Sequence, residues 1–127
     1  MPKFIPQHTP SGLDNFTESY FAAMEWLLPE DIDRDKIVAF SWRTIRRVES
    51  VCRKFQRENT AALEEFYAAT GGGPDLAGFC FFLNRNGHGT GFWDRDAGEC
   101  GEVLNKASHK YGETCESITK RGRIISE

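Results

Sequence analysis

The stretch Gly78–Arg95 reads GFCFFLNRNGHGTGFWDR and holds four of the ten phenylalanines of the chain and one of its three tryptophans. An apolar run stops at a polar, glycine-rich turn and resumes as a second aromatic run. This pattern is typical of a β-hairpin, because an Asn-Gly dipeptide tolerates the positive φ angles of a tight turn. Such a hairpin would bring six polar residues together: Asn84, Arg85, Asn86, His88, Asp94 and Arg95.

The segments before this stretch favour helices. Apolar residues at helical spacing predict a first helix from Leu13 to Leu28. Ser41 is a good N-cap for a long second helix that continues to about Ala69, with a break near Asn59 left open.

The segments after it predict one helix and a second hairpin. Asp96 followed by Glu99 has the spacing of a capping box, and the helix that it starts would end at Gly112. The tail reads as two strands joined by a turn at 120–122. The sum is an α+β domain of about three helices packed on a small, mostly antiparallel sheet made of two β-hairpins.

The length and composition set limits on organisation and function. We expect residues 1–10 to be an extended lead-in and residues 11–127 to form a single domain, because 127 residues supply one core. No apolar run or leader pattern predicts a membrane contact, so a cytoplasmic protein is expected. The four cysteines show no Cys-x-x-Cys spacing, so we predict neither a metal site nor a cofactor.

The predicted second helix carries a basic face. Six cations fall within an arc of about 120°, nearly opposite the apolar stripe of the helix: Arg43, Arg46, Arg47, Arg53, Lys54 and Arg57. From Arg43 to Arg57 the balance is +5, whereas the remaining ten basic and eighteen acidic residues give −8. A net charge of −3 therefore conceals a bipolar protein. A face of this kind suits nucleic-acid phosphates or an acidic protein surface. The alternative is that it is neutralised by the acidic loop Glu30–Asp35, by the acids of the first helix or by a second subunit.

The final turn adds two candidate binding residues, Lys120 and Arg121. Basic turns are common, so their value depends on the fold. If the turn lies beside the basic helix, the two form one surface.

The motif RNGHGTGFWDR, with the helix that follows it, resembles a family of small, uncharacterised proteins encoded by phages and prophages. In that family a near-invariable Arg-Asn-Gly-His-Gly turn precedes a Gly-Phe-Trp-Asp strand, a helix and a final hairpin. Two departures stand out: Phe79 and Cys80 replace a frequent His-Asp pair, and Lys120 and Arg121 precede Gly122 where the family tends to have acidic residues. The resemblance implies a phage setting, and hence a host cytoplasm, but no activity.

Three hypotheses for function follow. The first is a non-enzymatic phage-type accessory protein that binds a macromolecular partner, such as a host or anti-defence target, through the turn or the basic helix. The second is a nucleic-acid-binding protein that uses the arginine-rich helix. The third is a small enzyme in which Asp94 orients His88 as a general base. No further catalytic motif accompanies that pair, so we predict a protein that is not an enzyme and whose partner is a protein, with homo-oligomer formation left open.

Overall fold

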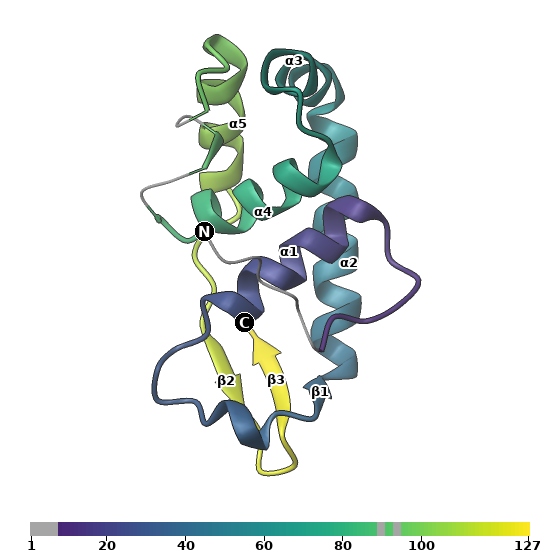
Figure 1. Cartoon of the computed structure of the whole chain (residues 1–127), viewed down its shortest axis with the longest axis vertical. Coiled ribbons are helices and arrows are strands. Elements are labelled where there is room, and N and C mark those ends of the chain that lie inside the picture. Colours follow the sequence, from purple (N-terminus) through teal and green to yellow (C-terminus); the bar gives the residue numbers. More distant parts are fainter. Residues whose placement is uncertain (1–7, 89–90, 93–94) are drawn as a thin grey trace.

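The computed structural model of the chain describes residues 8–88, 91–92 and 95–127. The α-helices along this part are α1 Asn15–Trp26, α2 Trp42–Glu58, α3 Thr60–Thr70, α4 Pro74–Arg85 and α5 Glu99–His109. The strands are β1 Ala39–Phe40, β2 Glu116–Ile118 and β3 Arg123–Ser126, and a short 3₁₀ helix, η1, spans Arg34–Lys36. The three strands lie together at one end of the molecule (Figure 1). The α+β class is therefore confirmed, whereas the expected numbers of helices and hairpins are wrong.

The predicted hairpin at 78–95 is the main error, because Gly78–Arg85 belongs to α4. Pro74 starts this helix at a position where a missing N–H costs nothing. Seven of its twelve residues are buried, since α1 and α5 both pack against it. A helix buried on most sides has no polar face to mark its period, so its apolar run is indistinguishable from that of a buried strand.

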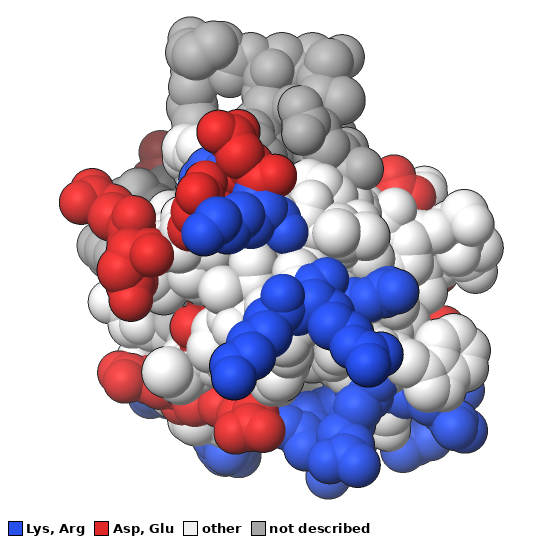
Figure 2. Space-filling view, turned by 90° about the horizontal axis from the view of Figure 1, so that it is seen from below, with Lys and Arg blue, Asp and Glu red and all other residues white. Residues whose placement is uncertain are grey.

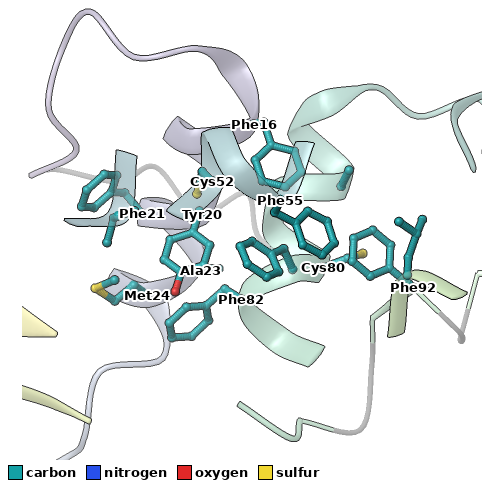
Figure 3. Close-up of a cluster of buried hydrophobic side chains, with 14 of the residues drawn as sticks. Phe16, Tyr20, Phe21, Ala23, Met24, Cys52, Phe55, Cys80, Phe82 and Phe92 are labelled. Carbon is teal, nitrogen blue, oxygen red and sulfur yellow. The ribbon is translucent and has the colours of Figure 1, made fainter. Parts of the chain in front are cut away.

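The crossing of α1 and α4 forms the centre of the core. A Cβ atom at Gly78 would overlap the carbonyl of Phe16, so only glycine permits this close approach. Around it the rings of Phe16, Tyr20 and Phe55 surround Phe81, whose ring stacks on Phe55 at 4.0 Å between centroids. Figure 3 shows this aromatic cluster continuing from Phe21 to Phe92. One hydrophobic cluster thus joins all five α-helices and the sheet.

The single long helix expected after Ser41 is two helices, α2 and α3. Ser41 caps α2 as predicted, because its side chain accepts the Thr44 N–H at 3.1 Å. Asn59, with φ −125° and ψ 25°, interrupts the helix, and its side-chain amide donates to the Phe55 carbonyl at 2.9 Å. The break lets Phe55 and Phe66 both reach the ring of Phe92.

The capping box predicted for the following helix is wrong. Asp96 has φ 53°, and α5 begins three residues later, at Glu99, after Gly98. The acidic residues Glu99 and Glu102 occupy its first turn and favour the positive end of the helix dipole.

The sheet has the order β1-β3-β2 and is mixed. The antiparallel β2–β3 hairpin is confirmed, and it is the one hairpin in the described residues. The strand β1 pairs in parallel with β3, with Phe40 opposite Ile124. Two residues cannot show a strand pattern in a sequence, which is why β1 went unpredicted.

None of the helices in the described ranges has the length and apolar character needed to cross a bilayer.

Candidate functional site

Asn84 and the first two residues of the RNGHGTGFWDR motif, Arg85 and Asn86, hold the fold together. The buried Asn84 side-chain oxygen accepts the Phe92 N–H at 2.8 Å. Arg85 donates to the carbonyls of Gly112 and Tyr111 at 2.8 and 3.2 Å and to the Tyr20 hydroxyl at 3.2 Å. These bonds fasten the end of α4 to two distant segments.

Asn86 has a similar structural role. Its side-chain oxygen accepts both the N–H and the hydroxyl of Thr114, at 2.7 and 3.0 Å. Its amide donates to the Phe82 carbonyl at 3.1 Å. The side-chain hydrogen bonds of Asn84, Arg85 and Asn86 are thus all made within the protein.

The remaining residues of the motif do not form a visible site. His88 is exposed, and its backbone N–H donates to the Leu83 carbonyl at 2.9 Å. Asp94, its expected partner, lies outside the described residues. Arg95 is exposed and reaches the Cys80 thiol, whose pKa is raised by burial and partly lowered by that guanidinium.

The six cations predicted on the second helix are all exposed on α2. Within the described residues these cations form one ion pair, which joins Arg53 to Glu49 at 3.7 Å; the two side chains are 72% and 42% exposed. Arg47 donates to the Ser126 carbonyl at 3.3 Å. The acidic loop before β1 therefore leaves the face largely unneutralised within the described part of the chain.

The final turn packs against residues 36–39, the segment that leads through β1 into α2. The Val38 N–H donates to the Gly122 carbonyl at 2.8 Å, and the Ser41 N–H donates to Ile124 at 2.8 Å. Gly122 has φ +79°, and a Cβ atom there would overlap the carbonyl of Lys36. The turn can therefore dock against residues 36–38 only because residue 122 is glycine.

These contacts join two basic segments into one surface, which we call the basic face. Its seven members are all exposed: Lys36, Arg43, Arg46, Arg47, Lys120, Arg121 and Arg123. Figure 2 looks onto this end of the molecule, where lysine and arginine side chains form a broad group and most acidic side chains lie to their left. No acidic residue occurs in 36–48 or 117–126, so the positive charge is not diluted along either segment.

The rest of the predicted cations lie further along α2. Lys54 sits 6.0 Å from the centroid of the Tyr111 ring. Burial raises the pKa of Tyr111 to about 12, and its hydrogen bond to Glu58 acts in the same direction, so the phenol stays neutral beneath Lys54. Arg53, Lys54 and Arg57 thus extend the positive charge but are not joined to the hairpin.

Two exposed apolar side chains lie within the basic face. Val38 is 63% exposed and Trp42 is 70% exposed. The guanidinium carbon of Arg46 lies 5.9 Å from the Trp42 ring centroid, which is within cation–π distance. Sequence reasoning does not single out Trp42, although its place four residues before Arg46 puts it on the polar side of the helix.

Sequence reasoning also missed a buried pair at the start of the chain. His8 Nδ1 contacts the carboxylate of Glu25, a residue that is 3% exposed on α1. The pair ties the N-terminal segment to α1. The spacing of Phe21 and Glu25, four residues apart, was the available signal that this carboxylate faces the core.

The described residues include no group of three or more histidine, cysteine, aspartate or glutamate side chains that could hold a metal ion. Comparisons with protein-family models, curated proteins and solved structures find no match to this chain. The basic face therefore has to be interpreted from its own chemistry.

Proposed function

We propose that this protein binds nucleic acid, holding the phosphate backbone on the basic face without carrying out a reaction. The observation that carries the proposal is the convergence of seven exposed cations, from two segments far apart in the sequence, on one end of the molecule. Phosphate contacts of this type supply most of the affinity in sequence-independent nucleic-acid binding.

The composition of the basic face favours nucleic acid over protein. The centre of a protein–protein interface is depleted in charged residues, whereas protein–nucleic acid interfaces are strongly positive. Five of the seven cations are arginines. Arginine presents a planar fork of donors that matches two phosphate oxygens at once.

The net charge of −3 does not prevent this binding, because the charges are separated in space. The basic face carries seven positive charges, while the remaining nine basic and nineteen acidic residues give a balance of −10. A nucleic acid would therefore be attracted to one end and repelled elsewhere, which fixes its docking orientation.

The test is the salt dependence of binding, measured by fluorescence anisotropy with labelled DNA at several potassium chloride concentrations. The double variant Arg43→Gln and Arg121→Gln removes one cation from each segment of the basic face. We expect it to weaken binding and to reduce the slope of log affinity against log salt by about 1.4 to 1.8, since each phosphate contact contributes about 0.7 to 0.9.

A matched control removes the same charge elsewhere. Lys106 and Lys110 are exposed at the end of α5, and the double variant Lys106→Gln and Lys110→Gln also changes the net charge by two. We expect its salt slope to equal that of the unmodified protein. Equal loss in both variants, or no binding by the unmodified protein at low salt, would overturn the proposal.

An acidic protein partner is the second candidate, and the exposed side chains of Val38 and Trp42 favour it. They supply the apolar contact that a protein interface buries. The phage resemblance suggests a host protein as such a partner. The test is affinity capture from host lysate with the unmodified protein, the Arg43→Gln and Arg121→Gln variant, and the α5 control. A protein that is retained by the unmodified protein and by the control but lost with the basic-face variant would support this candidate. A protein retained by all three would contradict it.

A further inference from the structure

The most exposed large apolar side chain in the described part of the chain is that of Trp42. In the sequence it lies between two cations of the basic face, Lys36 and Arg43. It is the first residue of α2, with Arg43 next to it and Arg46 against its ring. Single apolar side chains are common on protein surfaces, so exposure alone carries little weight. The setting carries more, because Arg46 lies over this indole and the neighbouring residues on both segments of the basic face are cations.

The position of Trp42 is fixed although its ring is solvated. Its backbone follows Ser41, whose side chain caps the helix and also donates to the Thr44 hydroxyl at 2.8 Å. The preceding strand β1 is paired with β3, so the start of α2 is held from two sides. The ring is therefore presented from a rigid support, while 70% of the residue stays open to solvent.

We infer that the ligand of the basic face is single-stranded nucleic acid, with one base stacked on Trp42 and the neighbouring phosphates held by arginines. This inference rests on the proposed function and names the strand type that the site takes. Proteins that bind single strands without sequence preference combine a positive surface with aromatic rings on which bases stack. The guanidinium carbon of Arg46 lies 5.9 Å from the centroid of the indole, so the ring that would receive the base is itself within cation–π distance of a phosphate-binding side chain.

A duplex would use the same phosphate contacts but not the ring. The bases of a duplex are stacked on one another, so their faces are closed to a side chain unless the helix is opened. Bases in a single strand are free to turn outward and to stack on an aromatic side chain. The indole therefore favours binding of a single strand over a duplex, whereas the cations alone would bind both.

The experiment compares three probes of equal length: oligothymidylate of about 16 nucleotides, near the upper site size of single-strand-binding folds, an abasic oligodeoxynucleotide, and a duplex. The variant is Trp42→Ala, and Val103→Ala on α5 is the control, because Val103 is also exposed, at 45%. Alanine is a good helix former, so α2 should persist, and thermal melting checks this.

We expect Trp42→Ala to bind oligothymidylate about 5- to 150-fold more weakly, the range that base stacking contributes per base. Its affinities for the abasic strand and the duplex should be unchanged, as should all three affinities of Val103→Ala. Trp42→Phe should recover part of the loss. Oligothymidylate should also quench the fluorescence of the unmodified protein more than that of Trp42→Ala.

The results separate this inference from the proposed function. If all three probes bind equally and Trp42→Ala lowers none of the affinities, stacking is excluded while binding through phosphate stands. If Trp42→Ala lowers all three affinities alike, the ring acts through the basic face and not on a base, which also overturns the inference. If no probe binds, both proposals fail.

Discussion

At the residue scale, the motif that looked most like a site is largely structural. The side-chain oxygens of Asn84 and Asn86 accept hydrogen bonds from backbone N–H groups of other segments. Arg85 donates to the carbonyls of Tyr111 and Gly112 and so joins them to α4. Buried polar groups need such partners, because an unpaired one costs free energy. Residue type alone does not distinguish a side chain that bonds inward from one that awaits a ligand, so the sequence could not settle this.

The structural role of Asn84 leads to a stability prediction. Replacing Asn84 by alanine leaves the Phe92 N–H without its acceptor in a buried setting, so we expect the free energy of unfolding to fall by about 1–3 kcal/mol. The control is His88→Ala, four residues further along the chain. We expect it to change the free energy of unfolding by less than about 0.5 kcal/mol, because His88 is exposed.

Urea denaturation followed by circular dichroism measures both values. Nucleic-acid binding by Asn84→Ala, measured below its melting temperature, should match that of the unmodified protein. A stable Asn84→Ala variant that had lost binding would show that the residue serves a ligand instead.

At the element scale, prediction succeeded where helix ends carry their own signals. Ser41 caps α2 as predicted, and α3 ends at Thr70, before Gly71 with φ 71°, close to the expected end near Ala69. It failed for α4, whose apolar run lacks a polar face, and for β1, which exists because β3 is there to pair with it. The period of apolar and polar residues predicts an element only when one face of it is solvated and its partners are local. A helix buried on most sides, or a short strand formed by pairing with a distant one, shows no such period.

The cap of α1 gives a prediction about pH. Asp14 precedes α1, and its carboxylate accepts the Thr17 N–H at 2.7 Å. Burial acts to raise the pKa of Asp14, but the hydrogen bonds from Thr17 and Gln56 and the nearby Arg53 outweigh it, so the pKa lies below its ordinary value of 3.8. A carboxyl group whose pKa is lower in the folded state stabilises the fold at pH values above its pKa in the unfolded chain. This stabilisation is lost as the pH falls through its pKa in the folded protein.

Asparagine caps helices about as well as aspartate but does not titrate here, so Asp14→Asn isolates this effect. We expect the unmodified protein to be more stable than Asp14→Asn at pH 7, and the difference to shrink between about pH 5 and pH 3. Urea denaturation of both proteins across this range measures it. All other acids titrate alike in the two proteins, so a difference that stays constant with pH would contradict the assignment.

At the scale of the whole molecule, the basic face is a product of the fold. Residues 36–47 and 120–123 are far apart in the sequence and meet because β1 pairs with β3 and Gly122 packs against Lys36. Both groups of cations could be recognised in the sequence, as could the condition that they form one surface if the final turn lies beside the basic helix. The parallel pairing of β1 with β3, which brings them together, could not be predicted. Trp42, the most exposed aromatic residue in the described part of the chain, stands beside cations of both segments only because of that arrangement.

The same connectivity predicts how the molecule unfolds. One hydrophobic cluster includes Phe40 from β1 and Ile124 from β3 together with Leu104 from α5, at the other end of the fold. A single continuous core has no internal boundary along which part of it could melt alone, so we expect one cooperative transition. Its enthalpy should be about 90 kcal/mol near 60 °C, from about 0.7 kcal/mol for each of 127 residues.

Thermal unfolding followed by tryptophan fluorescence and by far-ultraviolet circular dichroism should give coincident curves, and the calorimetric enthalpy should equal the van't Hoff value. The chain has three tryptophans, one of them Trp26 on α1, so the fluorescence difference between the unmodified protein and Trp42→Phe isolates the signal of Trp42 at the sheet end, whereas circular dichroism is dominated by the helices. A fluorescence change at lower temperature that is absent from Trp42→Phe would show that the sheet end melts separately. The basic face would then be held together by less than the whole core.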